Sequence, residues 1–252
     1  MSNGKIAIVT GGSRGIGRSA VLCLARRGVR SIFTYNANRA EADKVVALAA
    51  EAGARAIALQ LDTGHVGAFD GFAGHVRAAL AELGAERFDY LVNNAGISSG
   101  ASLETITEAE MDALYSVHFK GVLFLTQKLL PLIDDGGRIV NISSGLARFA
   151  MPNRIGYGPI KAAVEALTRS MAVELGPRRI AVNVVAPGAI ATDFSGGIVR
   201  DNPQVNKAVA DHTALGRVGV PDDVGPVIAA LLSDDFGWVN AQRIEVAGGV
   251  HI

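Results

Sequence analysis

Hydrophobic and polar residues divide the chain into two kinds of segment that alternate. Short runs rich in β-branched and aromatic residues are each followed by a longer stretch in which alanine and leucine recur with helical spacing. Near the N-terminus these segments are Ile6 to Thr10, Ile16 to Gly28, Ser31 to Tyr35 and Ala40 to Gly53. The order predicts strand, helix, strand and helix.

The same alternation continues through most of the chain. Further strands are predicted at 56–61, 88–92, 138–142, 180–185 and 243–246, and further helices at 67–83, 108–133 and 155–175. Parallel strands need crossover connections, and these are right-handed. The pattern therefore predicts a single α/β domain over residues 1–252, a doubly wound (Rossmann) parallel sheet of about seven strands with helices on both faces. Residues 188–219 break the rhythm, and an irregular segment of this length predicts a substrate lid.

Composition narrows the class of partner. The 252 residues suit one large core, and 24 basic against 24 acidic side chains leave no net charge to attract nucleic acid or a membrane. The single cysteine, the absence of a leader-like segment and the lack of an apolar run of about 18 residues predict a cytoplasmic protein. His65, His75, His212 and His251 lack the spacing of a metal site. We expect a small-molecule partner and no metal.

A glycine-rich segment follows the first predicted strand. Gly11, Gly15, Ile16 and Gly17 give the spacing Gly-x-x-x-Gly-x-Gly at the start of a predicted helix. Backbone N–H groups and the helix dipole favour anions there, and glycine allows a phosphate to approach the backbone closely. The segment therefore predicts a diphosphate-binding loop, although an ordinary glycine-rich turn could have the same sequence.

The end of the second predicted strand indicates which dinucleotide binds. Enzymes that select NAD commonly place a carboxylate there to bind the adenosine ribose 2′-hydroxyl. This chain has no acid between Tyr35 and Arg39. Arg14 lies in the glycine loop, and its planar guanidinium group suits a phosphate. We therefore predict NADP(H), held by Arg14 with Ser13 and Asn36; the alternative is that Arg14 is only solvated.

Polar residues also follow the third and fourth predicted strands, at the sheet edge where open α/β proteins bind ligands. Asp62 and Thr63 follow the third strand, and an Asn-Asn-Ala-Gly turn follows the fourth. Both segments could be structural, because an asparagine turn can satisfy loop backbone groups, and both could contact a nucleotide. The predicted cofactor contacts are Asp62, Thr63, Asn93, Ala95 and Gly96.

Tyr157 and Lys161 are candidates for the chemical step. They are four residues apart in a predicted helix, so both side chains leave the same face. A nearby cation favours the phenolate form of a tyrosine, which can then exchange a proton with the oxygen of a ketone or an alcohol. Ser144 ends the fifth predicted strand at the same sheet edge and could hold that oxygen. Residues 146–156 are expected to line the substrate entrance.

Together these motifs resemble the short-chain dehydrogenase/reductase family over essentially the whole chain, and the chain is similar to its 3-oxoacyl-acyl-carrier-protein reductase-like members. The resemblance implies that Tyr157 is the general acid/base, that Lys161 orients the nicotinamide ribose and lowers the tyrosine pKa, and that Ser144 positions the substrate oxygen. It implies further cofactor contacts from Tyr157, Lys161, Pro187, Gly188, Ile190 and Thr192. Members of the family are usually homotetramers and occasionally dimers.

Position 118 departs from the family pattern. An asparagine usually stands there and supports a water that leads to the lysine, whereas this chain has His118. A histidine could keep the relay, and it could add a pH dependence of its own because it titrates near neutrality. The alternative is a histidine with a structural role only, whose hydrogen-bonding groups are satisfied within the protein. Catalysis through His118 is therefore a hypothesis.

The leading prediction is an NADP(H)-dependent oxidoreductase that transfers hydride between the nicotinamide and a small carbonyl or alcohol substrate. A 3-oxoacyl thioester is one candidate substrate, but Asp134 and Asp135, at the end of a predicted helix, disfavour docking of an acidic carrier protein. One alternative is an NAD-dependent secondary alcohol dehydrogenase. Another is a non-catalytic NADP(H)-binding redox sensor, which would not need Ser144, Tyr157 and Lys161 together.

Overall fold

Seven parallel strands form one sheet in the order β3-β2-β1-β4-β5-β6-β7. In the computed structural model, which describes residues 4–252, these strands are β1 (Ile6–Val9), β2 (Arg30–Tyr35), β3 (Ala56–Gln60), β4 (Phe88–Asn93), β5 (Ile133–Ile142), β6 (Ala181–Pro187) and β7 (Arg243–Val246). The chain winds outward from β1 in one direction and from β4 in the other. The carboxyl ends of β1 and β4 therefore flank the switch point at which open α/β sheets bind ligands.

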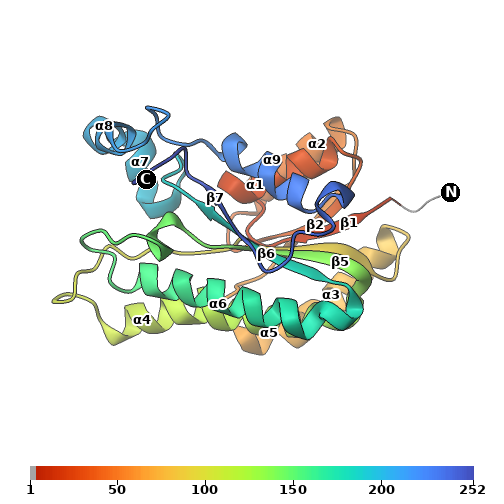
Figure 1. Cartoon of the computed structure of the whole chain (residues 1–252). Helices are drawn as coiled ribbons and strands as arrows, with labels where there is room; N and C mark the ends of the chain where they lie inside the picture. The colour runs from red at the N-terminus through yellow and green to blue at the C-terminus, as the bar shows by residue number, and fades with distance from the viewer. Residues whose placement is uncertain (1–3) are drawn as a thin grey trace.

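Helices cover both faces of the sheet (Figure 1). One layer contains α1 (Gly15–Ala25), α2 (Arg39–Glu51) and α9 (Pro221–Leu231), and the other contains α3 (Phe69–Glu82), α4 (Glu108–Tyr115), α5 (Gly121–Leu129) and α6 (Tyr157–Leu175). The short helices α7 (Ile198–Asp201) and α8 (Pro203–Asp211) lie at one end, beyond the strands (Figure 1). The predicted doubly wound sheet is confirmed.

Two hydrophobic cores lie on opposite sides of the sheet, and β1 contributes to both. Ile6 and Ile8 pack in the core with residues of α3 and α5, whereas Ala7 and Val9 pack with residues of α1 and α9. Alternate side chains of a strand point to opposite faces, so a strand covered on both sides is apolar throughout. This explains why β1 is a continuous apolar run.

The predicted helix at 108–133 is interrupted. It consists of α4, a π-helical turn over Ser116–Lys120, and α5, which ends at Leu129. Pro131 follows in a 3₁₀ turn, and β5 already begins at Ile133, earlier than the predicted strand start. π-Helical turns inside α-helices are rare and frequently accompany functional sites.

Helix α9 was not anticipated from the sequence. It begins with Pro221 and contains Gly225 and Pro226, which are poor helix formers. A Cβ on Gly225 would lie 2.2 Å from the Ser19 hydroxyl oxygen on α1, so glycine allows the two helices to pack closely. Close packing against α1 outweighs the low helix propensity of this segment.

The segment 188–219, predicted to be a lid, contains α7 and α8. Its two ends are joined, because Ile190 pairs with Gly219 in a β-bridge and the Ala191 N–H donates to the Gly219 carbonyl at 2.8 Å. The excursion is therefore anchored at its base beside the end of β6. Among residues 4–252, no helix has both the length and the apolar character needed to cross a bilayer.

Candidate active site

The glycine loop between β1 and α1 needs its glycines for backbone reasons. Gly11 and Gly15 have φ values of +65° and +54°, in the left-handed region that favours glycine. A Cβ on Gly17 would lie 2.2 Å from the Gly11 carbonyl oxygen. The loop can therefore adopt its tight path only with glycine at these positions.

The start of α1 is suited to an anion. Arg14 occupies the N-cap position, and its side chain caps none of the helix N–H groups; the first turn also contains no acidic residue. The first four N–H groups of a helix have no partner within the helix. These donors and the helix dipole fit a diphosphate, so the loop has the properties that a dinucleotide requires.

Hydrogen bonds hold the glycine loop to the turn that follows β4. The Thr10 hydroxyl oxygen accepts hydrogen bonds from the backbone N–H groups of Asn94 and Ala95, at 2.9 and 3.0 Å. The Asn94 side-chain amide donates back to the carbonyl oxygens of Thr10 and Gly11, at 2.9 and 3.2 Å. Asn94 thus fixes the spacing of the two loops by satisfying loop backbone groups, the structural role that the sequence left open for this turn.

Asn93 does not face the loops, in contrast to its predicted role as a cofactor contact. Its side chain is buried and donates to the Thr126 hydroxyl at 3.1 Å and to the Asn141 side-chain oxygen at 2.8 Å. This polar network lies between β4, β5 and α5. Asn93 is therefore a core residue, and Asn94, Ala95 and Gly96 follow it at the sheet edge.

The residues predicted to select NADP(H) lie in different environments. Arg14 and Asn36 are exposed, whereas Ser13 is buried. The Arg14 guanidinium forms an ion pair with Asp193 of the lid at 3.3 Å. Asp62 is exposed at the end of β3, and its carboxylate accepts a hydrogen bond from the Gly64 N–H at 2.8 Å. Arg14 and Asn36 are thus accessible to a ligand phosphate.

Ser144, Tyr157 and Lys161 meet beyond the carboxyl end of β5. Tyr157 is the first residue of α6, and the Ser144 hydroxyl, which accepts a hydrogen bond from the Leu146 N–H at 3.2 Å, lies near enough to act on the pKa of the phenol. The Lys161 ammonium lies 5.6 Å from the centre of the Tyr157 ring and donates to the Ile142 carbonyl at 2.8 Å. The neighbouring Ser143 points elsewhere, because its hydroxyl donates to Glu165 at 2.7 Å. The structure therefore brings the three predicted side chains together.

Burial dominates the electrostatics of this cluster. It lowers the pKa of Lys161 to about 7 because the charged ammonium loses contact with water. Burial also raises the pKa of Tyr157, while the nearby Ser144 hydroxyl and the positive charge of Arg154 lower it by a smaller amount. The phenol therefore keeps its proton at neutral pH.

His118 lies in the π-helical turn, edge-on to Tyr157 with 5.5 Å between ring centres. Its Nε2 is 2.7 Å from the Ile97 carbonyl oxygen and 3.2 Å from the Ile97 nitrogen. One ring nitrogen cannot donate and accept at once, and the shorter contact favours an Nε2–H that donates to the carbonyl. Burial, and then the charge of Lys161, lower the pKa of His118 well below 6.5. The geometry thus favours a neutral histidine that holds the loop at Ile97.

Gly96 makes room for this histidine. A Cβ at position 96 would lie 2.7 Å from His118 Cε1. The Asn-Asn-Ala-Gly turn therefore serves two structural purposes, the link through Asn94 to the glycine loop and the contact of Gly96 with His118.

The beginning of the lid spans the distance between the glycine loop and Tyr157. A Cβ on Gly15 would lie 3.4 Å from the Thr192 methyl group. The Thr192 hydroxyl accepts a hydrogen bond from the Phe194 N–H at 3.1 Å, and the Phe194 ring centre is 6.0 Å from that of Tyr157. Three successive residues thus connect the predicted cofactor loop with the predicted catalytic tyrosine.

Comparison with known proteins agrees with this arrangement. A family profile described as enoyl-(acyl carrier protein) reductase matches residues 11–251. An uncharacterized oxidoreductase of Methylorubrum extorquens is 38% identical over 98% of both chains. The chain belongs to the short-chain dehydrogenase/reductase family. The Arp2 hydroxynaphthalene reductase-like protein of Metarhizium brunneum, 36% identical over 98% of this chain and 94% of its own, is another relative.

Two solved structures of short-chain reductases have the same fold. The promiscuous reductase LugOII, which catalyses keto-reduction at C1 during lugdunomycin biosynthesis, superimposes with a TM-score of 0.94 at 38% identity, over 99% of this chain and 98% of its own. The angucycline C-6 ketoreductase LanV, solved with bound NADP, gives a TM-score of 0.92 at 34% identity, over 97% and 95% of the two chains. The chain is therefore an oxidoreductase of the short-chain dehydrogenase/reductase family.

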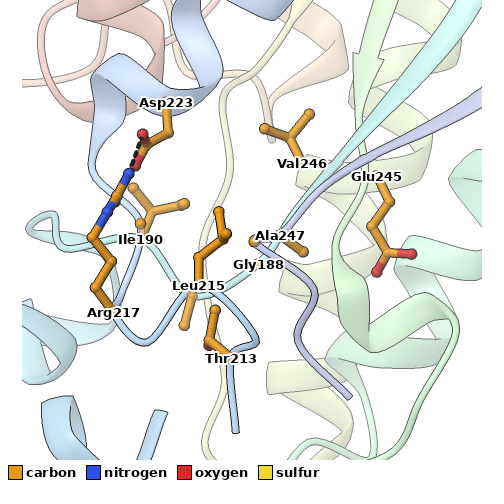
Figure 2. Close-up of a pocket in the computed structure, with 12 residues that line it drawn as sticks. Gly188, Ile190, Thr213, Leu215, Arg217, Asp223, Glu245, Val246 and Ala247 are labelled. Carbon is orange, nitrogen blue, oxygen red and sulfur yellow. Dashed lines mark hydrogen bonds and ion pairs between the residues drawn. The ribbon is translucent and has the colours of Figure 1, made fainter. Parts of the chain in front are cut away.

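A cavity of about 320 Å³ lies behind the start of the lid in this short-chain reductase fold (Figure 2). Gly188 and Ile190 line it together with residues at the end of β7 and just after it. The paired side chains of Arg217 and Asp223, whose nearest atoms are 2.6 Å apart, also line it. Ser144, Tyr157 and Lys161 are not among its lining residues. The cavity is thus distinct from the cluster of Ser144, Tyr157 and Lys161.

No metal centre is evident in the part of the chain that the structure describes. Within residues 4–252, no three His, Cys, Asp or Glu side chains are grouped so that they could hold a metal ion.

Proposed function

We propose that this short-chain dehydrogenase/reductase uses NADPH to reduce a ring ketone, with Tyr157 as the proton donor. The observation that carries the proposal is the cluster of Ser144, Tyr157 and Lys161 at the same edge of the sheet as the glycine loop. A phenol, a hydroxyl and an ammonium group in one buried site can protonate and hold an oxygen that gains negative charge. Bound NADPH would supply the hydride.

The loops beside the site support NADPH as the cofactor. The N-terminus of α1 would hold the diphosphate, and exposed Arg14 would bind the 2′-phosphate. The first acid after β2, Glu41, is half-buried and pairs with Lys44 at 2.6 Å, so its charge is partly neutralised. LanV was solved with NADP, and a further neighbour, a blue fluorescent protein from a metagenomic library, with NADPH.

The protonation states of the cluster suit reduction. Burial keeps the proton on Tyr157, so the phenol can donate it to the oxygen of the ketone as hydride arrives at the carbonyl carbon. The Ser144 hydroxyl would hydrogen-bond the same oxygen. Lys161 is fixed by the Ile142 carbonyl, 5.6 Å from the centre of the tyrosine ring. In its protonated form, which predominates below its pKa of about 7, it would stabilise the phenolate that remains.

Aromatic and apolar side chains around the cluster favour a ring substrate. The Phe194 ring lies beside Tyr157, and Ile97 and Ile155 are exposed at the loops that flank it. Aromatic rings stack on one another and on apolar surfaces. The names of the relatives point in the same direction, since they refer to a hydroxynaphthalene reductase-like protein and an angucycline ketoreductase.

The proposal is tested by the oxidation of NADPH and NADH, measured with purified protein. The substrates would be 1-tetralone, 2-tetralone, ethyl acetoacetate and acetoacetyl-coenzyme A, with Tyr157→Phe as the control variant. We expect turnover of the tetralones with NADPH, and a loss of at least about 100-fold in Tyr157→Phe. Unchanged turnover in the variant would refute the role of Tyr157, and tight NADPH binding without any turnover would favour the redox sensor.

The assembly expected from the family is a homotetramer. We propose that α4, α5 and α6, which form the outer surface of one layer, provide the main contact between copies (Figure 1). Light scattering of the purified protein tests this, and a monomeric mass would contradict it.

A further inference from the structure

A positively charged side chain of the entrance loop has no acidic partner. Arg154 lies three residues before Tyr157 and is half-buried. Among the described residues, no carboxylate lies within 4.0 Å of its guanidinium group, whereas Arg148 of the same loop pairs with Glu245 at 3.0 Å. The guanidinium group therefore keeps its charge without an acidic partner in the described part of the protein and can pair with an anion that displaces its water.

The protein uses only one nitrogen of the Arg154 guanidinium group to hold the side chain in position. Nη1 donates to the carbonyl oxygens of Ser99 and Asn153, at 2.9 and 3.2 Å. The guanidinium group has five N–H donors in a planar fork. Within residues 4–252, Nε and Nη2 have no recorded acceptor. One edge of the group therefore binds protein, and donors remain for a ligand.

The backbone around Arg154 is held in place by a turn at Asn153 and by a hydrogen bond to helix α6. Asn153 has a φ of +59°, a left-handed conformation that asparagine tolerates better than most residues. The Arg154 carbonyl accepts a hydrogen bond from the Gly158 N–H at 3.2 Å, which ties the residue to the first turn of α6. Arg154 is thus held next to the element that begins with Tyr157, and its charge is close enough to lower the pKa of that tyrosine.

The loop that carries Arg154, the loop after β4 and the lid expose apolar side chains. Exposed hydrophobic side chains occur on all three segments that frame the entrance, namely Ile97 after β4, Met151 and Ile155 before α6, and Phe194 and Ile198 in the lid. In the lid, Asp193 is already paired with arginines. An anionic group that entered among these side chains would find Arg154 as its partner, and a charge-assisted hydrogen bond to arginine is among the stronger polar contacts.

We propose that Arg154 is a specificity-determining residue that binds an anionic oxygen on the same molecule as the reacting ketone. The oxygen belongs to a carboxylate or to an ionised phenol on the ring system. This inference rests on the proposed ketone reduction. It narrows the substrate class from ring ketones in general to ring ketones that carry an acidic group at a distance from the carbonyl.

The experiment compares paired substrates in the intact protein. One arm uses 1-tetralone and tetralone carboxylates with the carboxylate at successive ring positions. The other uses 6-hydroxy-1-tetralone below and above the pH at which its phenol ionises, each rate divided by that of 1-tetralone at the same pH. The variants are Arg154→Gln, which keeps an N–H donor for the Ser99 carbonyl, Arg154→Lys, and Arg77→Gln as an exposed control on α3.

In the wild type we expect kcat/KM for at least one anionic substrate to exceed that of 1-tetralone by about 10- to 100-fold. The ratio should fall to near one in Arg154→Gln, mainly through KM, should be partly kept in Arg154→Lys, and should be unchanged in Arg77→Gln. A wild type without preference for any anionic substrate would overturn the inference. So would a variant in which all substrates lose the same factor, because Arg154 would then only hold the loop.

The two arms also separate the sources of the anionic oxygen. A preference confined to the carboxylates assigns the site to a carboxylate, and one that rises as the phenol ionises assigns it to a phenolate. Failure of the underlying ketone reduction looks different, because 1-tetralone itself would then show no turnover that depends on Tyr157.

Discussion

Arg14 of the glycine loop and Asp193 of the lid lie 3.3 Å apart, although 179 positions separate them in the sequence. Asp193 also forms an ion pair with Arg200, so one lid carboxylate is shared by two arginines. If Arg14 binds the 2′-phosphate of NADPH, that phosphate and the Asp193 carboxylate compete for the same guanidinium group.

The first prediction follows from this competition. Asp193→Asn should lower the dissociation constant for NADPH by about two- to fivefold, because an exposed ion pair of this kind is weak. The dissociation constant for NADH should not change, since NADH has no 2′-phosphate. Fluorescence titration of both cofactors measures the effect. Weaker NADPH binding in the variant would show that Asp193 positions Arg14 for the phosphate instead of competing with it.

The second prediction concerns the stability contributed by His118. Burial and the charge of Lys161 hold its pKa well below 6.5, whereas a histidine in the unfolded chain takes up a proton near pH 6.5. The unfolded state therefore binds more protons in acid, and stability is lost as the pH falls below about 6.5. His118→Asn should reduce this loss by up to about 1.4 kcal/mol per pH unit. Urea denaturation between pH 5 and pH 8 measures it.

The same variant tests the proton-relay hypothesis. A neutral His118 that only holds the Ile97 loop should leave the shape of the pH–rate profile between pH 6 and pH 8 unchanged after substitution by asparagine. Disappearance of an ionisation near neutrality in His118→Asn would instead show that the imidazole exchanges a proton during turnover.

The third prediction concerns Lys161. Its folded-state pKa is lowered to about 7 by burial, whereas a lysine in the unfolded chain titrates near 10.4. Between these values the unfolded state binds more protons, so the free energy of unfolding rises with pH by up to about 1.4 kcal/mol per unit. In Lys161→Met this rise should be absent, and the variant's stability relative to the wild type should decline from pH 7 to pH 10. If the free energy of unfolding depended on pH in the same way in both proteins, the pKa of Lys161 would not be lowered in the folded state.

The sequence predicted the sheet, the glycine loop and the Tyr157 cluster because each depends on local spacing. Strand periodicity places Ser144 at a strand end, and helical periodicity places Lys161 one turn after Tyr157. All parallel strands end at one edge, so the motifs that follow them come together without further information.

Two features of the site were missed for different reasons. Asn93 was predicted to contact the cofactor, but strand alternation puts its side chain on the same face as Leu91, in the core with Thr126. That signal was available in the sequence. The π-helical turn at His118 had no such signal, because it accompanies a bond to Ile97 and the space left by Gly96.

The fourth prediction compares the same substitution in two helices. A Cβ on Gly17, in α1, would lie 2.2 Å from the Gly11 carbonyl oxygen and 2.5 Å from the Asn94 side-chain nitrogen. Both atoms belong to the link between the glycine loop and the turn after β4. Gly17→Ala should therefore push the two loops apart, lower the free energy of unfolding by about 1–3 kcal/mol, and weaken NADPH binding.

Gly74 is the matched control, because it lies exposed in α3 and a Cβ there would meet nothing within 4 Å. Alanine has the higher helix propensity, so Gly74→Ala should raise the free energy of unfolding by up to about 1 kcal/mol and leave NADPH binding unchanged. If close packing at Gly17 is essential, urea denaturation of the two variants gives changes of opposite sign, and NADPH titration shows weaker binding in Gly17→Ala alone. If both variants were stabilised equally, the glycine loop would be able to move away from an added methyl group. Its tight geometry would then not be needed to bind the diphosphate.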